Sequence, residues 1–297
     1  MTQMQPRNSD LDSAVAEARE RYSAARPESE RIHRAARAVL PGGNTRSVLF
    51  YTPFPTAMAR GAGCSLEDVD GRRYLDFCGE YTAGLFGHSE PRIQAALHAA
   101  IDRGLNLAAV GEREAQLAAL LCARFPSLER VRFTNSGTEA NMLALGVARA
   151  YSGRPGVLAF RGGYHGGLLT LVGGGSAINS PIPLTLADYN DTQQTLEVLR
   201  AHAGELAAVI LEPMMGSGGC IPAHPEFLRA LREATRELGV LLLFDEVMTS
   251  RHSSGGLQKL RGVTPDLTTL GKYMAGGMSF GAFGGRADVM GLFDGHR

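Results

Sequence analysis

Short apolar runs that alternate with helical stretches are the feature that most constrains the fold of this 297-residue chain. The runs cover residues 131–133, 157–160, 207–211 and 240–244, and the helical stretches cover about residues 90–103, 112–124, 138–151, 192–203 and 225–238. A continuous apolar run between helices is typical of a strand that is buried on both faces, as in parallel sheets. The pattern therefore predicts an α/β fold with a mainly parallel sheet flanked by helices.

The N-terminal part of the chain has a different pattern. Residues 11–40 are rich in Ala, Arg and Glu and predict one or two exposed helices that are interrupted near Pro27. Between residues 64 and 77, two alternating runs flank Asp70-Gly71, which is a strong β-hairpin signal. We therefore expect an N-terminal helical segment with the start of a hairpin over residues 1–70, as part of a small domain, and a large domain over residues 71–297.

Charge and composition exclude several classes of protein. The 30 Lys and Arg residues balance the 30 Asp and Glu residues, whereas nucleic-acid binders usually carry a basic excess. The N-terminus has no apolar signal segment, and no run approaches the roughly 18 apolar residues of a membrane span. The four cysteines form no C-x-x-C pair and no metal-ligand spacing. We therefore expect a cytoplasmic protein with reduced thiols, no metal site, and neither a nucleic-acid nor a membrane partner.

Polar and small residues follow each predicted strand, and ligands of parallel sheets bind beyond the carboxyl ends of the strands. The first run is followed by Ser136-Gly137-Thr138-Glu139, which opens a helix. One interpretation is a capping box with Ser136 at the N-cap and Glu139 at N3. The free N–H groups of a helix start, together with the two hydroxyls, also suit a phosphate. The two interpretations are compatible, because a cap can also bind an anion.

Three further strand ends carry groups that could surround a flat, charged ring. Asp245 follows an apolar strand, so its carboxylate is expected to be buried and to need a partner. That partner could be an arginine, a helix N-terminus or a protonated pyridine nitrogen. Tyr164 and His165 lie in a glycine-rich loop, where they are either ordinary loop residues or an aromatic cover for a ring. Glu212 follows the third run.

The chain contains only two lysines, Lys259 and Lys272. Lys259 has the polar surroundings of a solvated surface ammonium. Lys272 lies between Leu270 and Tyr273, before glycines and after another short apolar stretch, which again indicates a strand end. A desolvated lysine has a lowered pKa and can attack a carbonyl. Lys272 is therefore predicted to be the reactive amine.

A phosphate site, an aromatic cover, a carboxylate for a ring nitrogen and a buried amine together meet the requirements of pyridoxal 5′-phosphate (PLP). The stretches that contain these groups also resemble class III aminotransferases, which are PLP-dependent enzymes of fold type I. The resemblance lies in residues 134–141, 163–167, 211–213, 244–249 and 269–277. Residues 44–50, 80–84 and 245–251 favour the branch of β-amino-acid (β-phenylalanine-type) aminotransferases, to which glutamate-1-semialdehyde 2,1-aminomutase is a close relative.

The resemblance implies a role for each of these residues. Lys272 would hold the cofactor as an internal aldimine and then move a proton between substrate and cofactor, while Asp245 would pair with the ring nitrogen. Val247 would pack on one face of the ring and Tyr164 would cover the other, with His165 beside it. The remaining roles fall to Ser136, Gly137 and Thr138 at the phosphate, Glu212 as an acid near the cofactor, and Arg46 as the partner of a substrate carboxylate.

The resemblance also implies a reaction and an assembly. An amino group would pass from a β-amino acid to a 2-oxo acid, in an enzyme that is a homodimer in its full-length form. Family members continue past the position at which this chain ends, so we expect a C-terminal domain that completes the small domain to be absent here. Two alternatives stay open: a glutamate-1-semialdehyde 2,1-aminomutase, and a truncated PLP-fold domain without catalytic activity.

Motifs of other enzyme classes fit the sequence less well. A G-x-S-x-G match around Ser279 has no apolar strand before it, and only Asp288, Asp294 and His296 follow as an acid or base. A hydrolase nucleophile needs a strand before it and a helix after it. The glycines of residues 61–66 lack the third glycine of a dinucleotide-binding loop. The sequence therefore favours neither a serine hydrolase nor a Rossmann dehydrogenase.

Overall fold

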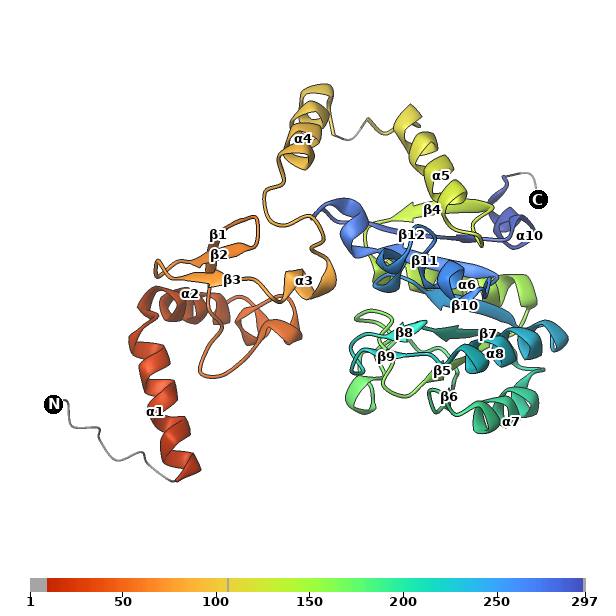
Figure 1. Ribbon diagram of the computed structural model, residues 1–297, viewed down its shortest axis with the longest axis horizontal. Helices are drawn as coiled ribbons and strands as arrows, with labels where there is room; N and C mark the ends of the chain where they lie inside the picture. Colours follow the sequence, from red (N-terminus) through yellow and green to blue (C-terminus); the bar gives the residue numbers. More distant parts are fainter. Residues whose placement is uncertain (1–9, 106, 296–297) are drawn as a thin grey trace. The chain divides into compact units, whose positions relative to one another are not determined.

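The computed structural model describes residues 10–105 and 107–295, and within it the chain forms two compact units. The first unit contains the residues up to Gly79 together with Phe86–Arg103, and the second contains Glu80–Leu85 and the residues from Gly104 onward. The polar segment 1–9 and His296, both of which the sequence interpretation used, lie outside the described residues. Figure 1 labels the elements of both units.

The first unit combines helices with a small antiparallel sheet, as its sequence predicts. Its elements are α1 (Leu11–Ala24), α2 (Pro27–Arg37), β1 (Met58–Ala62), β2 (Ser65–Asp68), β3 (Arg73–Leu75) and α4 (Pro91–Arg103), with short 3₁₀ turns at Pro41–Gly43 and Ser47–Leu49. The predicted break near Pro27 is the start of α2, where proline is favoured because the first N–H of a helix has no partner to lose. The strands pair in the order β1-β2-β3.

Asp70, in the turn between β2 and β3, joins the hairpin to α2. Its carboxylate accepts hydrogen bonds from the backbone N–H of Glu28 at 2.8 Å and from the N–H and hydroxyl of Ser29 at 3.1 and 2.7 Å. The domain boundary predicted between residues 70 and 71 lies inside the first unit. The chain does not divide there because the turn itself caps the helix.

A seven-stranded sheet forms the centre of the second unit, in the order β4-β12-β11-β10-β7-β5-β6. Its strands are β4 (Arg130–Thr134), β5 (Gly156–Phe160), β6 (Leu184–Ala187), β7 (Leu206–Leu211), β10 (Leu241–Asp245), β11 (Leu267–Gly271) and β12 (Gly281–Gly285). Only β12 runs antiparallel to its neighbours. The prediction of a mainly parallel sheet flanked by helices is therefore confirmed.

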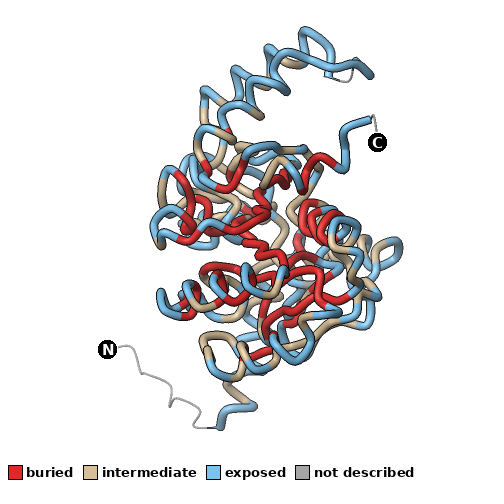
Figure 2. The backbone as a smooth tube through the Cα atoms, turned by 90° about the vertical axis from the view of Figure 1, so that its right-hand side faces the viewer, coloured by how far each residue is buried: buried red, intermediate tan, exposed pale blue. Residues whose placement is uncertain are grey.

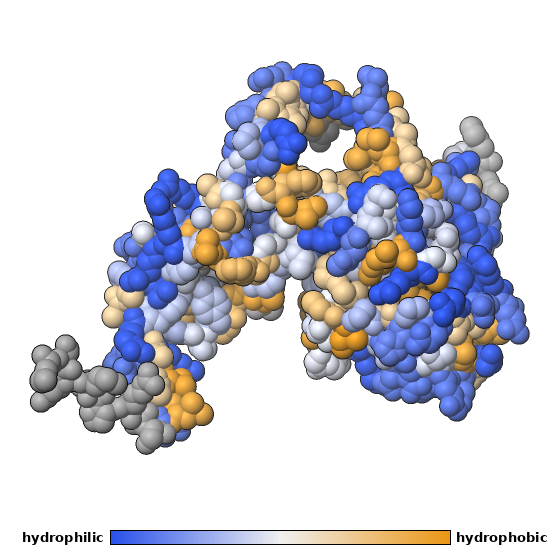
Figure 3. Space-filling model, in the orientation of Figure 1, coloured by the Kyte–Doolittle hydropathy of each residue, from blue (hydrophilic) through white to orange (hydrophobic). Residues whose placement is uncertain are grey.

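Helices cover both faces of this sheet. They are α5 (Glu112–Arg124), α6 (Gly137–Ser152), α7 (Thr192–His202), α8 (Pro225–Glu237) and α10 (Ala287–Met290). Along β10, Leu241 and Leu243 belong to the core shared with α6 and α10, whereas Leu242 and Phe244 belong to the core shared with α7 and α8. This alternation follows from the two-residue period of a strand. The buried segments of the unit are red in Figure 2, and the outer sides of α7 and α8 are mainly hydrophilic in Figure 3.

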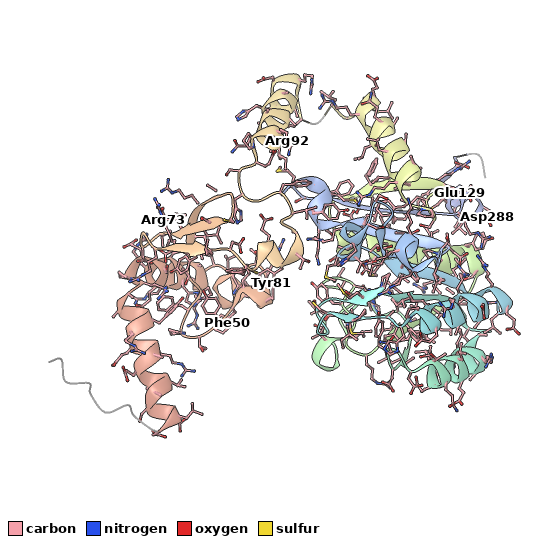
Figure 4. All side chains as sticks on the ribbon, in the orientation of Figure 1. Phe50, Arg73, Tyr81, Arg92, Glu129 and Asp288 are labelled. Atoms are coloured by element: carbon pink, nitrogen blue, oxygen red, sulfur yellow. The ribbon has the colours of Figure 1, made fainter. Side chains whose placement is uncertain are left out.

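Shorter elements complete the second unit and its junctions. They are α3 (Gly79–Thr82), β8 (Met214–Met215), β9 (Ile221–Pro222), α9 (Gly256–Arg261) and 3₁₀ turns at Val172–Gly174, Thr249–His252, Lys272–Ala275 and Gly291–Phe293. Glu129, just before β4, accepts a hydrogen bond of 2.7 Å from the N–H of Ala287 and so fixes the start of α10 near Asp288 (Figure 4). Among the described helices, none combines the length and apolar character that a membrane span requires.

Strand β12 lies close to its neighbours because glycine occupies three of its five positions. A Cβ atom at Gly281 would lie 2.1 Å from the carbonyl oxygen of Ser136, and one at Gly284 would lie 2.2 Å from that of Arg130. Glycine is depleted in most strands, so the sequence did not indicate this strand. The absence of side chains is what lets β12 fit between β4 and β11.

We expect Gly281→Ala to lower the free energy of unfolding by about 1–3 kcal/mol, because the added methyl group must push β12 away from the turn that starts α6. Gly146→Ala is the matched control, since Gly146 is an exposed residue of α6 with no atom within 4 Å of its would-be Cβ. That change should raise stability by about 0.5–1 kcal/mol. Urea unfolding of both variants measures the difference. If Gly281→Ala unfolds at the same urea concentration as the wild type, β12 tolerates a side chain at this position.

Candidate active site

The predicted site residues gather in the second unit, at the edge of the sheet where its parallel strands end. Ser136 follows β4, Tyr164 follows β5, Glu212 follows β7, and Lys272 follows β11, while Asp245 is the last residue of β10. In parallel sheets this edge is the usual position of a ligand. Arg46 is the one predicted site residue that belongs to the first unit.

The start of α6 is the segment in which the sequence predicts an anion site. Ser136 is the N-cap, and its hydroxyl accepts a hydrogen bond of 3.1 Å from the N–H of Glu139. The Glu139 carboxylate reaches back to the N–H of Asn135 at 2.8 Å, one residue further than in the usual capping box. The N–H groups of Gly137 and Thr138 have no carbonyl one turn earlier in the helix. They are therefore available to an anion.

Two glycines bring the surrounding segments into close contact. A Cβ at Gly137 would lie 2.9 Å from both methyl groups of Val247, and one at Gly166 would lie 2.2 Å from the hydroxyl of Thr138. Gly166 also has a φ of +110°, a backbone conformation that residues other than glycine rarely adopt. Thr138 in turn accepts a hydrogen bond of 3.2 Å from the N–H of Gly167. The helix start, the loop that contains Tyr164, and the segment after β10 therefore form one cradle.

Asp245 is a buried carboxylate, only 3% exposed, whose partners are a side-chain amide, an imidazole and a backbone N–H. Its Oδ2 accepts a hydrogen bond of 2.8 Å from the side-chain amide of Asn141 and lies 2.9 Å from Nδ1 of His165. Its Oδ1 accepts one of 3.0 Å from the N–H of Val247. No arginine or lysine among the described residues lies within salt-bridge distance of it. The structure thus places His165 against Asp245, in the core, with 1% exposure.

Lys272 is the first residue of the turn after β11 and has a φ of +54°, an unfavourable backbone conformation for a lysine. Its amine donates a hydrogen bond of 3.1 Å to the hydroxyl of Thr82. Burial lowers the pKa of the Lys272 amine, although the carboxylates of Asp245 and Glu212 act in the opposite direction. Lys259, in contrast, is exposed on α9. The two lysines therefore differ as the sequence predicts.

We expect Lys272→Met to stabilise the cofactor-free protein at neutral pH, because the partly buried amine must be charged there at a cost. The ordinary pKa is 10.5 and the folded-state pKa is lower, so the unfolded chain binds more protons between the two values and stability rises with pH in that range. The advantage of the variant should therefore be largest at neutral pH and shrink toward pH 10.5. Thermal unfolding measures it, with roughly 2–4 °C expected for each kcal/mol. An advantage that is independent of pH would contradict this cause.

Glu212 connects the loop after β5 with the loop after β7. Its carboxylate accepts hydrogen bonds from the N–H of Tyr164 at 3.0 Å and from the N–H of Gly216 at 2.9 Å. Burial, and then the nearby charge of Asp245, raise the pKa of Glu212. Tyr164 itself is 42% exposed, so its side chain is not enclosed by the protein. Glu212 therefore acts on the site through the loop that contains Tyr164.

Two polar residues that the sequence did not indicate, Asn141 and Thr269, contact this site. Asn141, on the buried side of α6, joins Asp245 to the loop after β5, and Thr269, in β11, donates a hydrogen bond of 2.6 Å to the Asn141 side chain. Asn141 lies beside Ala140 and one turn before Ala144 and Leu145, all fully buried. A polar residue on an apolar helix face is the signal that could have revealed it.

Other chemistries find less support. Ser279 lies between the turn after β11 and the start of β12, so no strand precedes it and no helix follows it directly. It therefore does not have the geometry of a hydrolase nucleophile. Within the described part of the chain, no three His, Cys, Asp or Glu side chains gather as a metal site would need.

Comparison with known proteins identifies the family. The sequence profile of the family "Aminotransferase class-III" matches residues 50–296. β-Phenylalanine transaminase of Variovorax paradoxus is 51% identical over 284 residues, which cover 96% of this chain and 65% of the relative. A glutamate-1-semialdehyde 2,1-aminomutase of Methanothermobacter thermautotrophicus is 40% identical over 275 residues, or 88% of this chain and 66% of the relative. The chain belongs to the class III aminotransferase family, as its motifs predict.

Solved structures extend the similarity to three dimensions. The crystal structure of a β-phenylalanine aminotransferase from V. paradoxus superposes with a TM-score of 0.94, over 97% of this chain and 67% of that one. A transaminase structure described as having PLP bound gives a TM-score of 0.86 at 34% identity, over 92% of this chain and 67% of that one. The chain thus spans about two thirds of the length of its relatives, and only 65% of the V. paradoxus transaminase.

Proposed function

We propose that this protein binds PLP and belongs to an enzyme that transfers an amino group from a β-amino acid to a 2-oxo acid. The observation that supports the proposal best is the position of Lys272, an amine of lowered pKa, at the same sheet edge as the buried carboxylate of Asp245. The donor class rests on the 51% identity to the V. paradoxus transaminase. A homodimer, which the family resemblance implies, is proposed for the full-length form.

The residues present fit PLP. Lys272 supplies an amine for its aldehyde. Asp245 supplies a buried carboxylate for its ring nitrogen, and this carboxylate has no lysine or arginine partner among the residues that the structure describes. The free N–H groups of Gly137 and Thr138 suit its phosphate. A Cβ at Gly137 would crowd Val247, so glycine keeps open the space beside the residue proposed to pack on the ring. When bound, PLP withdraws electrons from the substrate carbon that bears the amino group.

The chain's own residues perform the other tasks. The lowered pKa of Lys272 keeps a larger fraction of its amine neutral and reactive, and the same Nζ can accept and return a proton. Asp245 is held by three neighbours and keeps an unsaturated Oδ1. Tyr164 and Val247 lie on segments that the cradle glycines bring together, and they would confine a flat ring. Glu212 fixes the backbone of Tyr164.

We propose Arg46 as the residue that binds the donor's carboxylate. It is exposed, and its backbone N–H donates to the side chain of Asn44 at 3.0 Å, which shapes the loop around it. Arg46→Ala should raise KM for carboxylated donors about 10- to 100-fold, since a hydrogen bond to a charged group contributes about 1.5–3 kcal/mol. Cofactor affinity should stay unchanged. An unchanged KM for every such donor would assign the role to another arginine.

A donor screen on the PLP-loaded chain tests the proposed function. β-Phenylalanine, an α-amino acid and glutamate 1-semialdehyde are supplied separately, with and without a 2-oxo acid. Turnover of the β-amino acid only with a 2-oxo acid supports the proposal. Conversion of glutamate 1-semialdehyde without an acceptor would support an aminomutase instead, the alternative favoured by the 40% identical relative. PLP uptake without turnover of any donor would indicate a non-catalytic cofactor-binding chain.

A further inference from the structure

We propose that Asn141 and Thr269 are positioning residues that fix the direction in which Asp245 presents its carboxylate to the cofactor. This inference rests on the proposed function, because it assumes that Asp245 serves the PLP ring nitrogen. Neither residue is expected to touch the cofactor. Both act through Asp245, from two different elements, α6 and β11.

The direction of the hydrogen bonds follows from the chemistry of the groups. Thr269 donates its hydroxyl hydrogen to Oδ1 of Asn141 at 2.6 Å, and an amide oxygen can only accept. The amide nitrogen of Asn141 must then face the other way, where it donates to Oδ2 of Asp245 at 2.8 Å and to the carbonyl oxygen of His165 at 3.1 Å. Reversing the amide would set oxygen against oxygen at both contacts. The oxygens of Asp245 and His165, which can only accept, therefore fix which way the Asn141 amide points, and Thr269 supplies the donor for the amide oxygen on the other side.

Burial makes this arrangement the only one available to these groups. Thr269 is 0% exposed, Asn141 and His165 are 1% exposed, and Asp245 is 3% exposed. A buried polar group that loses its partner pays the full cost of desolvation, because water cannot replace that partner. Oδ2 of Asp245 is saturated by Asn141 and His165, whereas Oδ1 accepts only from the N–H of Val247. The network therefore leaves Oδ1 as the oxygen with capacity for a further donor.

Thr268 offers a matched control inside the same strand. It is also 0% exposed, but adjacent residues of a strand face opposite sides of the sheet. Its hydroxyl lies 2.7 Å from that of Ser127 and accepts a hydrogen bond of 3.1 Å from the side chain of Gln258. Neither partner contacts Asp245. Thr268→Val thus removes a buried hydroxyl of the same kind without touching the proposed network.

The experiment compares PLP affinity in the cofactor-free wild type and in Thr269→Val, Thr268→Val and Thr269→Ser, together with the thermal unfolding midpoint of each. Thr269→Val should bind PLP about fivefold more weakly, the effect of one lost hydrogen bond. Thr268→Val should lower the unfolding midpoint about as much as Thr269→Val does, because each change removes one buried hydroxyl. It should change the PLP affinity by less than about twofold. Thr269→Ser, which keeps the hydroxyl, should restore wild-type affinity. Asn141→Ala tests the other end of the network and should weaken binding about tenfold or more.

Each outcome decides between the explanations. If Thr269→Val and Thr268→Val weaken PLP binding equally, the threonines are merely structural and the inference is overturned. Wild-type affinity in both Thr269→Val and Asn141→Ala overturns it as well. If the wild type itself fails to bind PLP, the proposed function is wrong, and the inference falls with it. Wild-type binding with unaffected variants refutes the inference alone.

Discussion

Lys272→Ala is expected to abolish covalent PLP binding and to lower turnover by at least about 10³-fold, whereas Lys259→Ala leaves both unchanged. These two are the only lysines in the chain, so the two variants together test every lysine that could bind the cofactor. Lys272 is partly buried and its pKa is lowered by that burial. Lys259 is exposed, and its amine lies 3.4 Å from the hydroxyl of Ser254.

Borohydride reduction makes the bond between cofactor and amine permanent, and peptide mapping then locates it. The pyridoxyl group should appear on the peptide that contains Lys272. The α-amine of the chain is a non-specific competitor, so the map must also show an unmodified N-terminal peptide. A modified Lys259, or visible cofactor absorbance that survives in Lys272→Ala but not in Lys259→Ala, would contradict the assignment of the site.

The sheet, and the position of the candidate site residues at one of its edges, could be predicted because their signals are local. Strands β5, β7 and β10 are continuous apolar runs, and each is buried along its whole length. Residues that follow such runs must lie at one edge of a parallel sheet, which is why Asp245 and Lys272 could be brought to one site without coordinates. The capping pattern of Ser136 is likewise contained in four consecutive residues.

The features that were missed depend on contacts between distant residues. Thr269 and Asn141 are 128 positions apart, and nothing in either local sequence indicates the other. Strand β12 was missed because its glycines serve close packing against β4, not strand propensity. The boundary between the units was misplaced for the same reason, since Asp70 in the hairpin turn bonds to Glu28 and Ser29.

Asp245→Asn is expected to lower turnover by about 10³-fold while PLP affinity falls by no more than about tenfold. An amide is neutral and cannot stabilise a protonated ring nitrogen, so the bound cofactor loses its capacity to withdraw electrons. The amide oxygen can keep the place of Oδ2 beside Asn141. Its NH₂ group then faces the N–H of Val247 and loses that hydrogen bond. The fold should therefore persist with a modest loss of stability.

Asp266→Asn is the matched control, because Asp266 is a second buried carboxylate at the opposite edge of the sheet. It precedes β11 and pairs with Arg232 at 2.8 Å and with Arg286 at 3.0 Å. Neutralising Asp266 takes from the largely buried Arg232 its carboxylate partner, whereas Arg286 keeps its ion pair with Asp288, so stability should fall by about 3 kcal/mol. Turnover per folded molecule should stay unchanged, since the cofactor residues follow the other ends of the strands.

Steady-state rates and unfolding curves for both variants separate the effect on turnover from the effect on stability. Near-normal turnover in Asp245→Asn would make Asp245 a structural carboxylate like Asp266, and the ring nitrogen of PLP would need another partner.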